Sequence, residues 1–110
     1  MGQLIYGSTG TVVEIDDRAL AHLKVVMITK LRRSEGFAFS WDEELANGSG
    51  RSTVWVHPSV SLHFKFYGTR QPAMNKLWLE ELMASANSSG GLHILPEHDR
   101  TTENEVPPIY

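Results

Sequence analysis

The sequence predicts an α+β fold, a two-layer sandwich in which a mostly antiparallel sheet carries two helices on one face. Short extended runs with alternating apolar and polar residues are separated by turn residues, and two longer segments repeat apolar residues every three or four positions. Links between neighbouring runs are too short for the crossover connections that parallel strands require. The expected element order is therefore β-β-α-β-β-β-α-β, with one-sided helices covering the sheet.

The chain opens with a predicted β-hairpin. Residues 3–7 and 11–16 are extended runs, and Ser8-Thr9-Gly10 between them has the turn chemistry of a hairpin, with glycine at the bend. The second run alternates in polarity, so one of its faces is expected to be drier than the other.

A helix is predicted next, capped by Asp16 or Asp17, whose side chain accepts hydrogen bonds from the first free backbone N–H groups. The last turn of this helix is rich in basic residues, and Gly36 is expected to end the helix by adopting a left-handed backbone conformation. The apolar stripe of this helix consists of Leu20, Leu23, Met27 and Leu31. The opposite face is expected to face solvent and consists of Arg18, His22, Thr29 and Arg33.

The middle of the chain predicts three strands. Residues 37–42 place three aromatic side chains on one face, and residues 43–51 are expected to form a mobile loop. Two further strands, 52–57 and 62–67, flank Pro58-Ser59 and are expected to form a hairpin. Leu62, Phe64 and Phe66 point to one side of the last strand, and His63, Lys65 and Tyr67 to the other.

A second helix is expected from about Pro72, which suits a first helical turn, to the segment Ser88-Ser89-Gly90-Gly91. Residues 92–95 form the last predicted strand, which completes a single domain over residues 1–96. Residues 97–110 contain four acids and one base and few apolar groups, so a flexible acidic tail is predicted. The alternative is that the last four residues dock as a short extended peptide.

Composition excludes several classes of protein. The chain has 110 residues, no cysteine and a net charge of −3, so disulfides, thiolate zinc sites and a strongly basic nucleic-acid module are excluded. The N-terminus lacks the pattern of a secretory signal, and no window approaches the length of about 20 apolar residues that spans a membrane. We therefore expect a cytoplasmic protein that does not act at a membrane.

No motif predicts a catalytic residue, a cofactor or a metal. The segment 48–53 differs from a phosphate-binding loop, which needs another glycine at position 45 and a following helix. The histidines lack metal-binding spacing, although His57 and His63 are expected to approach each other across the predicted hairpin. No serine lies in the Gly-x-Ser-x-Gly pattern of a nucleophile elbow. The acid pairs Glu43-Glu44 and Glu80-Glu81 are sequence neighbours that are expected to be exposed, and neither is expected to form a catalytic pair.

Two surfaces are candidates for binding. The outward side of the central strands carries Trp55, His57, His63, Lys65 and Tyr67, which suits self-association or protein docking. The same aromatic and basic residues, together with polyanion contacts from Arg18, Arg32 and Arg33, support the alternative of a DNA-associated accessory domain. A sheet surface that is merely solvated is the third interpretation.

Several segments resemble one small family: Leu4-Ile5-Tyr6-Gly7, Lys30-Leu31-Arg32-Arg33-Ser34-Glu35 leading into Phe39-Ser40-Trp41, Gly48-Ser49-Gly50-Arg51-Ser52, and Ser85-Ala86-Asn87-Ser88-Ser89-Gly90-Gly91-Leu92. The chain resembles, over residues 1 to about 96, a group of stand-alone actinobacterial proteins that form a domain of unknown function. Many members carry the label ATP-dependent DNA ligase, so the resemblance implies a link to DNA transactions.

The ligase label implies a chemistry that the residues do not match. A nucleotide-dependent ligase attacks ATP with the lysine of a Lys-x-Asp-Gly motif, and none of the lysines at positions 24, 30, 65 and 76 begins that pattern. The chain is also too short for an adenylation domain and an oligonucleotide-binding barrel together. The resemblance therefore implies a family without catalytic residues to carry over, and the sequence favours a small non-catalytic interaction module.

Overall fold

The computed structural model describes residues 1–8, 10–42, 50–98 and 105–106 of the chain. Within these residues the helices are α1 (Asp17–Arg32) and α2 (Lys76–Ala86). The longer strands are β1 (Gly2–Tyr6), β2 (Thr11–Ile15), β3 (Phe37–Asp42), β4 (Arg51–Val56) and β5 (Leu62–Lys65). Three two-residue strands complete the fold: β6 (Met74–Asn75), β7 (Leu92–His93) and β8 (Glu105–Val106).

The strands divide between two three-stranded sheets and one small pair. Sheet A has the order β2-β1-β5 and is antiparallel throughout. Sheet B has the order β4-β3-β7, in which β3 pairs antiparallel with β4 and parallel with β7. β6 pairs with β8. The α+β class, the mostly antiparallel pairing and the order of the predicted elements are confirmed.

The predicted hairpin between residues 52–57 and 62–67 is wrong, because the two strands belong to different sheets. β5 pairs with β1, where Phe64 lies opposite Leu4 and extends the apolar face of that strand. The turn after β4, closed by a hydrogen bond from the backbone N–H of Val60 to the carbonyl of His57 (2.8 Å), carries the chain from sheet B to sheet A. His57 and His63 are therefore not cross-strand neighbours.

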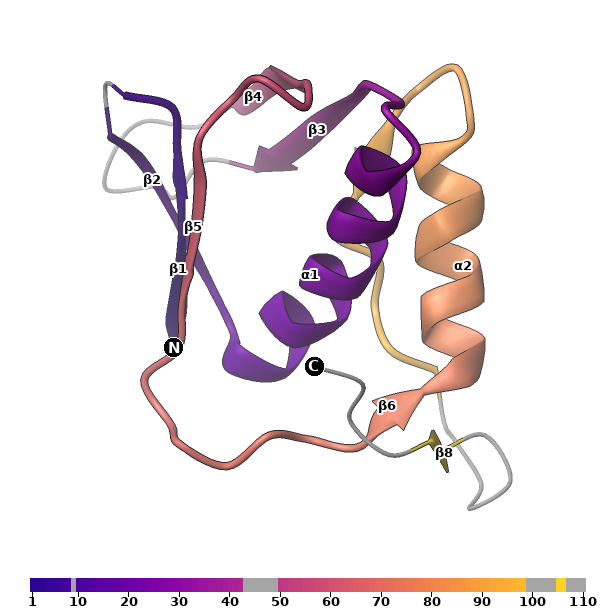
Figure 1. The fold of residues 1–110 in the computed structure, drawn as a ribbon. Coiled ribbons are helices and arrows are strands. Elements are labelled where there is room, and N and C mark those ends of the chain that lie inside the picture. The colour runs from indigo at the N-terminus through magenta and orange to yellow at the C-terminus, as the bar shows by residue number, and fades with distance from the viewer. Residues whose placement is uncertain (9, 43–49, 99–104, 107–110) are drawn as a thin grey trace.

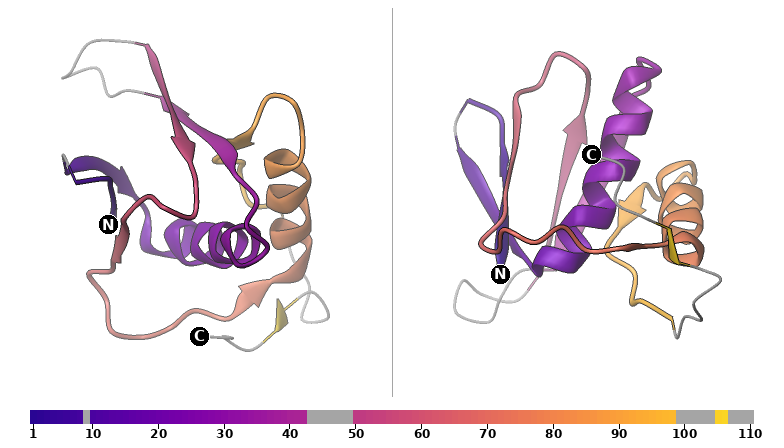
Figure 2. Two further views of the ribbon diagram at one scale, coloured as in Figure 1. Left: turned by 45° about the horizontal axis from the view of Figure 1, so that its top comes forward. Right: turned by 60° about the horizontal axis from the view of Figure 1, so that its bottom comes forward.

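α1 lies between sheet A on one side and α2 on the other, as Figure 1 and both views of Figure 2 show. Its predicted apolar stripe is confirmed, since Leu20, Leu23 and Met27 are buried and Leu31 packs against the core. The predicted inward face of residues 62–66 likewise packs against the core. Burial of this continuous apolar cluster is the main favourable contribution to folding.

Three local predictions of the sequence need correction. Asp16 does cap α1, but the residue with left-handed backbone after the helix is Ser34 (φ 59°) rather than Gly36. α2 begins at Lys76 with Asn75 as its cap, four residues after Pro72, because the Asn75 side chain accepts the backbone N–H of Trp78. His22, which the helical pattern places on the solvent-facing side of α1, is fully buried.

The predicted boundary between domain and tail stays a prediction. Glu97, the first residue of the predicted tail, accepts hydrogen bonds from the side chains of Arg18 and Asn75, and residues 105–106 pair with β6. The loop predicted at 43–51 and the docking peptide predicted at 107–110 fall mostly or wholly outside the described residues. Among the described helices, none is long and apolar enough to cross a membrane.

Candidate functional site

No described helix or strand covers the face of sheet A that points away from α1, a surface of three strands that we call the outer face of sheet A (Figure 1). Strand alternation directs Leu4, Val13 and Phe64 into the core and their neighbours outward. The register aligns the outward residues in two rows across the strands β2, β1 and β5: Glu14, Gln3 and Lys65 in one row, and Val12, Ile5 and His63 in the other.

The two rows differ in chemistry. Glu14 at one edge and Lys65 at the other carry opposite charges, and Gln3 between them donates a hydrogen bond from Nε2 to Glu14 Oε2 at 2.7 Å. The second row is mainly apolar, with Ile5 half-buried and Val12 48% exposed. Tyr67, which follows two residues after Lys65, is 57% exposed. An apolar row beside a charged row, on an uncovered sheet, is the chemistry of an association surface.

The structure divides the five residues predicted as one interaction surface. His63 and Lys65 share the outer face of sheet A, and Tyr67 lies two residues beyond the end of β5. Trp55, which is 59% exposed, lies on β4 of sheet B, and His57 lies just beyond that strand. The sequence pattern identified which residues are outward, but it missed Gln3 and Glu14, which only the strand register places in one row with Lys65.

The three arginines predicted as polyanion contacts do not converge. Arg18 is at the start of α1 and Arg32 and Arg33 are at its end, about 20 Å apart at 1.5 Å per residue. The Arg18 guanidinium is also engaged, because Nε and Nη2 donate to the two carboxylate oxygens of Glu97 at 2.9 and 2.8 Å and Nη1 donates to the carbonyl of Ala73. Arg32 and Arg33 are exposed.

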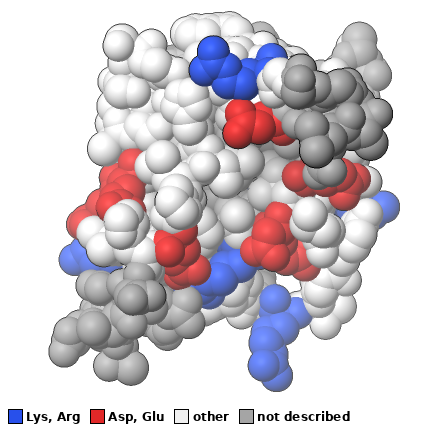
Figure 3. All heavy atoms as spheres, turned by 180° about the vertical axis from the view of Figure 1, so that it is seen from behind, with Lys and Arg blue, Asp and Glu red and all other residues white. Residues whose placement is uncertain are grey.

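The view from behind shows how charge is distributed over that side of the molecule (Figure 3). Acidic side chains gather in several separate groups, with lysine and arginine side chains between them and at the edges. The described part of this face therefore presents mixed charge rather than the basic surface that neutralises a phosphate backbone.

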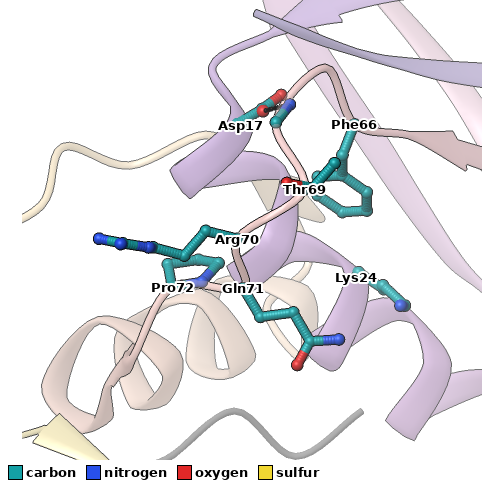
Figure 4. A pocket seen from close by; sticks show the side chains of 8 residues that line it. Asp17, Lys24, Phe66, Thr69, Arg70, Gln71 and Pro72 are labelled. Carbon is teal, nitrogen blue, oxygen red and sulfur yellow. Dashed lines mark hydrogen bonds between the residues drawn. The ribbon is translucent and has the colours of Figure 1, made fainter.

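A small cavity of about 180 Å³ lies where the segment 66–72 crosses the start of α1 (Figure 4). Asp17 accepts hydrogen bonds there from the backbone nitrogens of Gly68 (2.9 Å) and Tyr67 (3.3 Å), and these hydrogen bonds lower the pKa of its carboxyl group. Arg70 and Lys24 extend in different directions (Figure 4), so their charges do not meet over the cavity. The arrangement explains how α1 holds this segment.

Larger open hollows lie beside β3 and β7 on sheet B. One, of about 310 Å³, is lined by residues that include Glu14, Asp42 and Trp41, and the other, of about 550 Å³, includes Thr53 and Gly90. Both share Ser40, Arg51 and His93. Sequence reasoning did not single out these three residues as a group, because they come from three different strands. Among the described residues, no group of three or more side chains that could hold a metal ion is found.

Comparison with known proteins identifies the family. Residues 1–97 match a domain of unknown function, DUF7882. The chain belongs to this family. No curated protein and no solved structure matches it. The DUF7882 match thus covers sheet A, sheet B and both helices, and it includes the described residues of the outer face of sheet A and of the hollows on sheet B.

Proposed function

We propose that this DUF7882 chain is a non-catalytic, cytoplasmic interaction module that associates with a second copy of itself through the outer face of sheet A. The observation that carries the proposal is the placement of Glu14 and Lys65 at opposite edges of one row, with Gln3 between them.

A two-fold axis parallel to β1 makes this face self-complementary. The rotation exchanges the two edges of the sheet, so Glu14 of one copy faces Lys65 of the other, and Lys65 faces Glu14. Ile5 then packs on Ile5 at the axis, and Val12 packs on the ring of His63. Aligned sheets pack about 10 Å apart, a spacing that long side chains such as glutamate and lysine bridge. Symmetric pairing of one patch with itself is the commonest form of association.

The size of the patch predicts weak association. Strands of five residues are about 17 Å long, and three strands present less than the area of about 800 Å² per partner that is typical of stable complexes. The DUF7882 chain should therefore exist as a monomer and a dimer in exchange, with a dissociation constant above about 10 µM.

Sedimentation velocity tests the proposal directly. Samples from about 10 µM to about 500 µM should show a concentration-dependent rise in weight-average mass. Substitution of the central contact, Ile5→Asp, should abolish the rise, because it buries a carboxylate at the axis. The matched control Ile28→Asp changes an exposed isoleucine on α1, outside sheet A, and should leave the rise intact. A strict monomer at about 500 µM contradicts the proposal.

The alternative is the DNA-associated accessory domain that the ligase label of actinobacterial relatives implies. Its proposed contacts, Lys65 on sheet A, Trp55 on sheet B and the arginines on α1, lie on separate elements. DNA binding through phosphates predicts affinity that falls steeply with salt. A salt-dependent shift of duplex DNA by the wild-type chain, lost in Arg32→Gln/Arg33→Gln, would favour this alternative.

A further inference from the structure

We propose that the hollow on the outward face of sheet B binds a small oxyanion, with a phosphomonoester as the best-matched class of ligand. The described residues that line this site come from sheet B and the turn before β7, whereas the proposed association surface lies on sheet A.

The strand register brings three donor side chains into one row. Thr53 of β4 lies opposite Ser40 of β3, and Ser40 lies opposite His93 of β7. Side chains at paired positions of adjacent strands point to the same face, about 5 Å apart. Arg51, two residues before Thr53, points to the same face one step along β4.

The hydroxyl groups leave a proton for a ligand. Ser40 Oγ and Thr53 Oγ1 are 2.7 Å apart and share one hydrogen bond, so whichever hydroxyl accepts keeps its own O–H to donate elsewhere. The hollow over this pair has a volume of about 550 Å³, and the described residues that line it, Ser40, Arg51, Thr53, Gly90 and His93, include no acid. Gly90 lies beside the imidazole, where an added Cβ atom would be 3.7 Å from Nε2 of His93.

The donors favour an anion with oxygens on several sides. A guanidinium group, an imidazole and a hydroxyl approach the hollow from three strands, which suits a tetrahedral oxyanion better than a planar carboxylate. Among the described residues, no carboxylate forms an ion pair with Arg51, although Asp42 is its cross-strand neighbour.

Two acids limit the size of the ligand. Asp42 and Glu14 line the adjoining hollow of about 310 Å³, next to the shared residues Ser40, Arg51 and His93. A single phosphoryl group at the Thr53 end avoids these carboxylates, whereas an extended polyanion would have to cross them. The site therefore fits one phosphoryl group and disfavours a nucleic-acid backbone.

Titration of the full chain with inorganic phosphate and with a simple phosphomonoester, followed by ¹H–¹⁵N NMR at constant ionic strength, tests the assignment. We expect saturable chemical-shift changes that cluster at Ser40, Thr53, Gly90 and His93. Tighter binding of the ester identifies a phosphomonoester as the ligand, and tighter binding of inorganic phosphate identifies free phosphate. Arg51→Gln should weaken binding at least about tenfold. The matched control Arg70→Gln, at an exposed arginine of the 66–72 segment, should leave binding unchanged.

Three results would overturn the assignment: shifts that do not saturate up to about 50 mM phosphate, shifts spread over all basic residues, or binding that survives Arg51→Gln. Preferential binding of a single-stranded oligonucleotide over the phosphomonoester would also overturn it. Because Arg51 is outside sheet A, its substitution should not change sedimentation, and failure here leaves the self-association proposal intact.

Discussion

The backbone N–H of Asn75 donates a hydrogen bond to Nε2 of the buried His22 at 2.8 Å. On the other side of the ring, Nδ1 lies 2.8 Å from the carbonyl oxygen of Arg18, so Nδ1 carries the proton and the imidazole is neutral. The ring also packs against Trp78 with 4.5 Å between centroids. One histidine thus connects α1 to the start of α2.

Replacing His22 with phenylalanine should destabilise the chain by about 1–3 kcal/mol, because the Asn75 N–H loses its partner in a buried position while the ring contact with Trp78 is retained. Urea unfolding measures the change. The same substitution at the exposed His57 is the control and should change stability by less than about 0.5 kcal/mol. Equal effects at both positions would contradict the role given to His22.

Gly91 should not tolerate alanine. Its φ is +82°, and an added Cβ atom would lie 2.8 Å from the carbonyl oxygen of Ala38, where the chain crosses β3. We expect Gly91→Ala to lower stability by about 1–3 kcal/mol and the melting temperature accordingly. Gly90→Ala is the matched control, since the nearest atom to its added Cβ is 3.7 Å away. Equal melting temperatures of the Gly91→Ala and Gly90→Ala variants would contradict this explanation.

The contact between Asp17 and the 66–72 segment should be sensitive to acid. The backbone hydrogen bond from Gly68, joined by that from Tyr67, lowers the pKa of its carboxyl group below the unfolded value. The contact therefore stabilises the fold above about pH 4 and is lost as pH falls through the lowered pKa. Because Asp17 is only half-buried, the effect should be modest.

Urea midpoints measured between about pH 7 and pH 3 should fall less steeply in Asp17→Asn than in the wild-type chain. Glu80→Gln, at an exposed position of α2, is the control and should follow the wild-type profile. An unchanged slope in Asp17→Asn would show that this carboxylate does not hold the 66–72 segment.

The boundary of the domain can be measured through Glu97. A chain ending at His98 keeps the contacts of Glu97 with Arg18 and Asn75, whereas a chain ending at Pro96 loses them. We expect the shorter chain to be less stable by about 1–3 kcal/mol, because charge-assisted hydrogen bonds are among the stronger ones. Equal stability would place the end of the folded domain at Pro96, as the composition of the tail predicts.

Local patterns in the sequence predicted local structure well. Alternation identified the inward Leu62 and Phe64 and the outward His63 and Lys65, because strand periodicity depends only on neighbouring residues. The cap at Asp16 was also predictable from its side chain and position. The buried His22 was not, because its partner Asn75 is 53 residues away and a polar residue is normally placed in water.

Pairing between distant strands was beyond the reach of these patterns. Pro58-Ser59 correctly marked a turn, but a turn does not say which strand the chain will join, and β5 joined β1 rather than β4. Both candidate sites depend on such pairings. Glu14 and Lys65 share a row because both pair with Gln3 of β1, and Ser40 pairs with Thr53 of β4 and His93 of β7. Neither group could be assembled before the register was known.

The most direct test of self-association through the outer face of sheet A is a charge exchange between Glu14 and Lys65. Each single variant, Glu14→Lys or Lys65→Glu, should sediment as a monomer, because the two-fold axis sets like charges against each other twice. An equimolar mixture of the two variants should recover the dimer, since each chain then offers the charge that the other lacks. A mixture that stays monomeric, or single variants that associate as the wild-type chain does, would contradict the proposed interface.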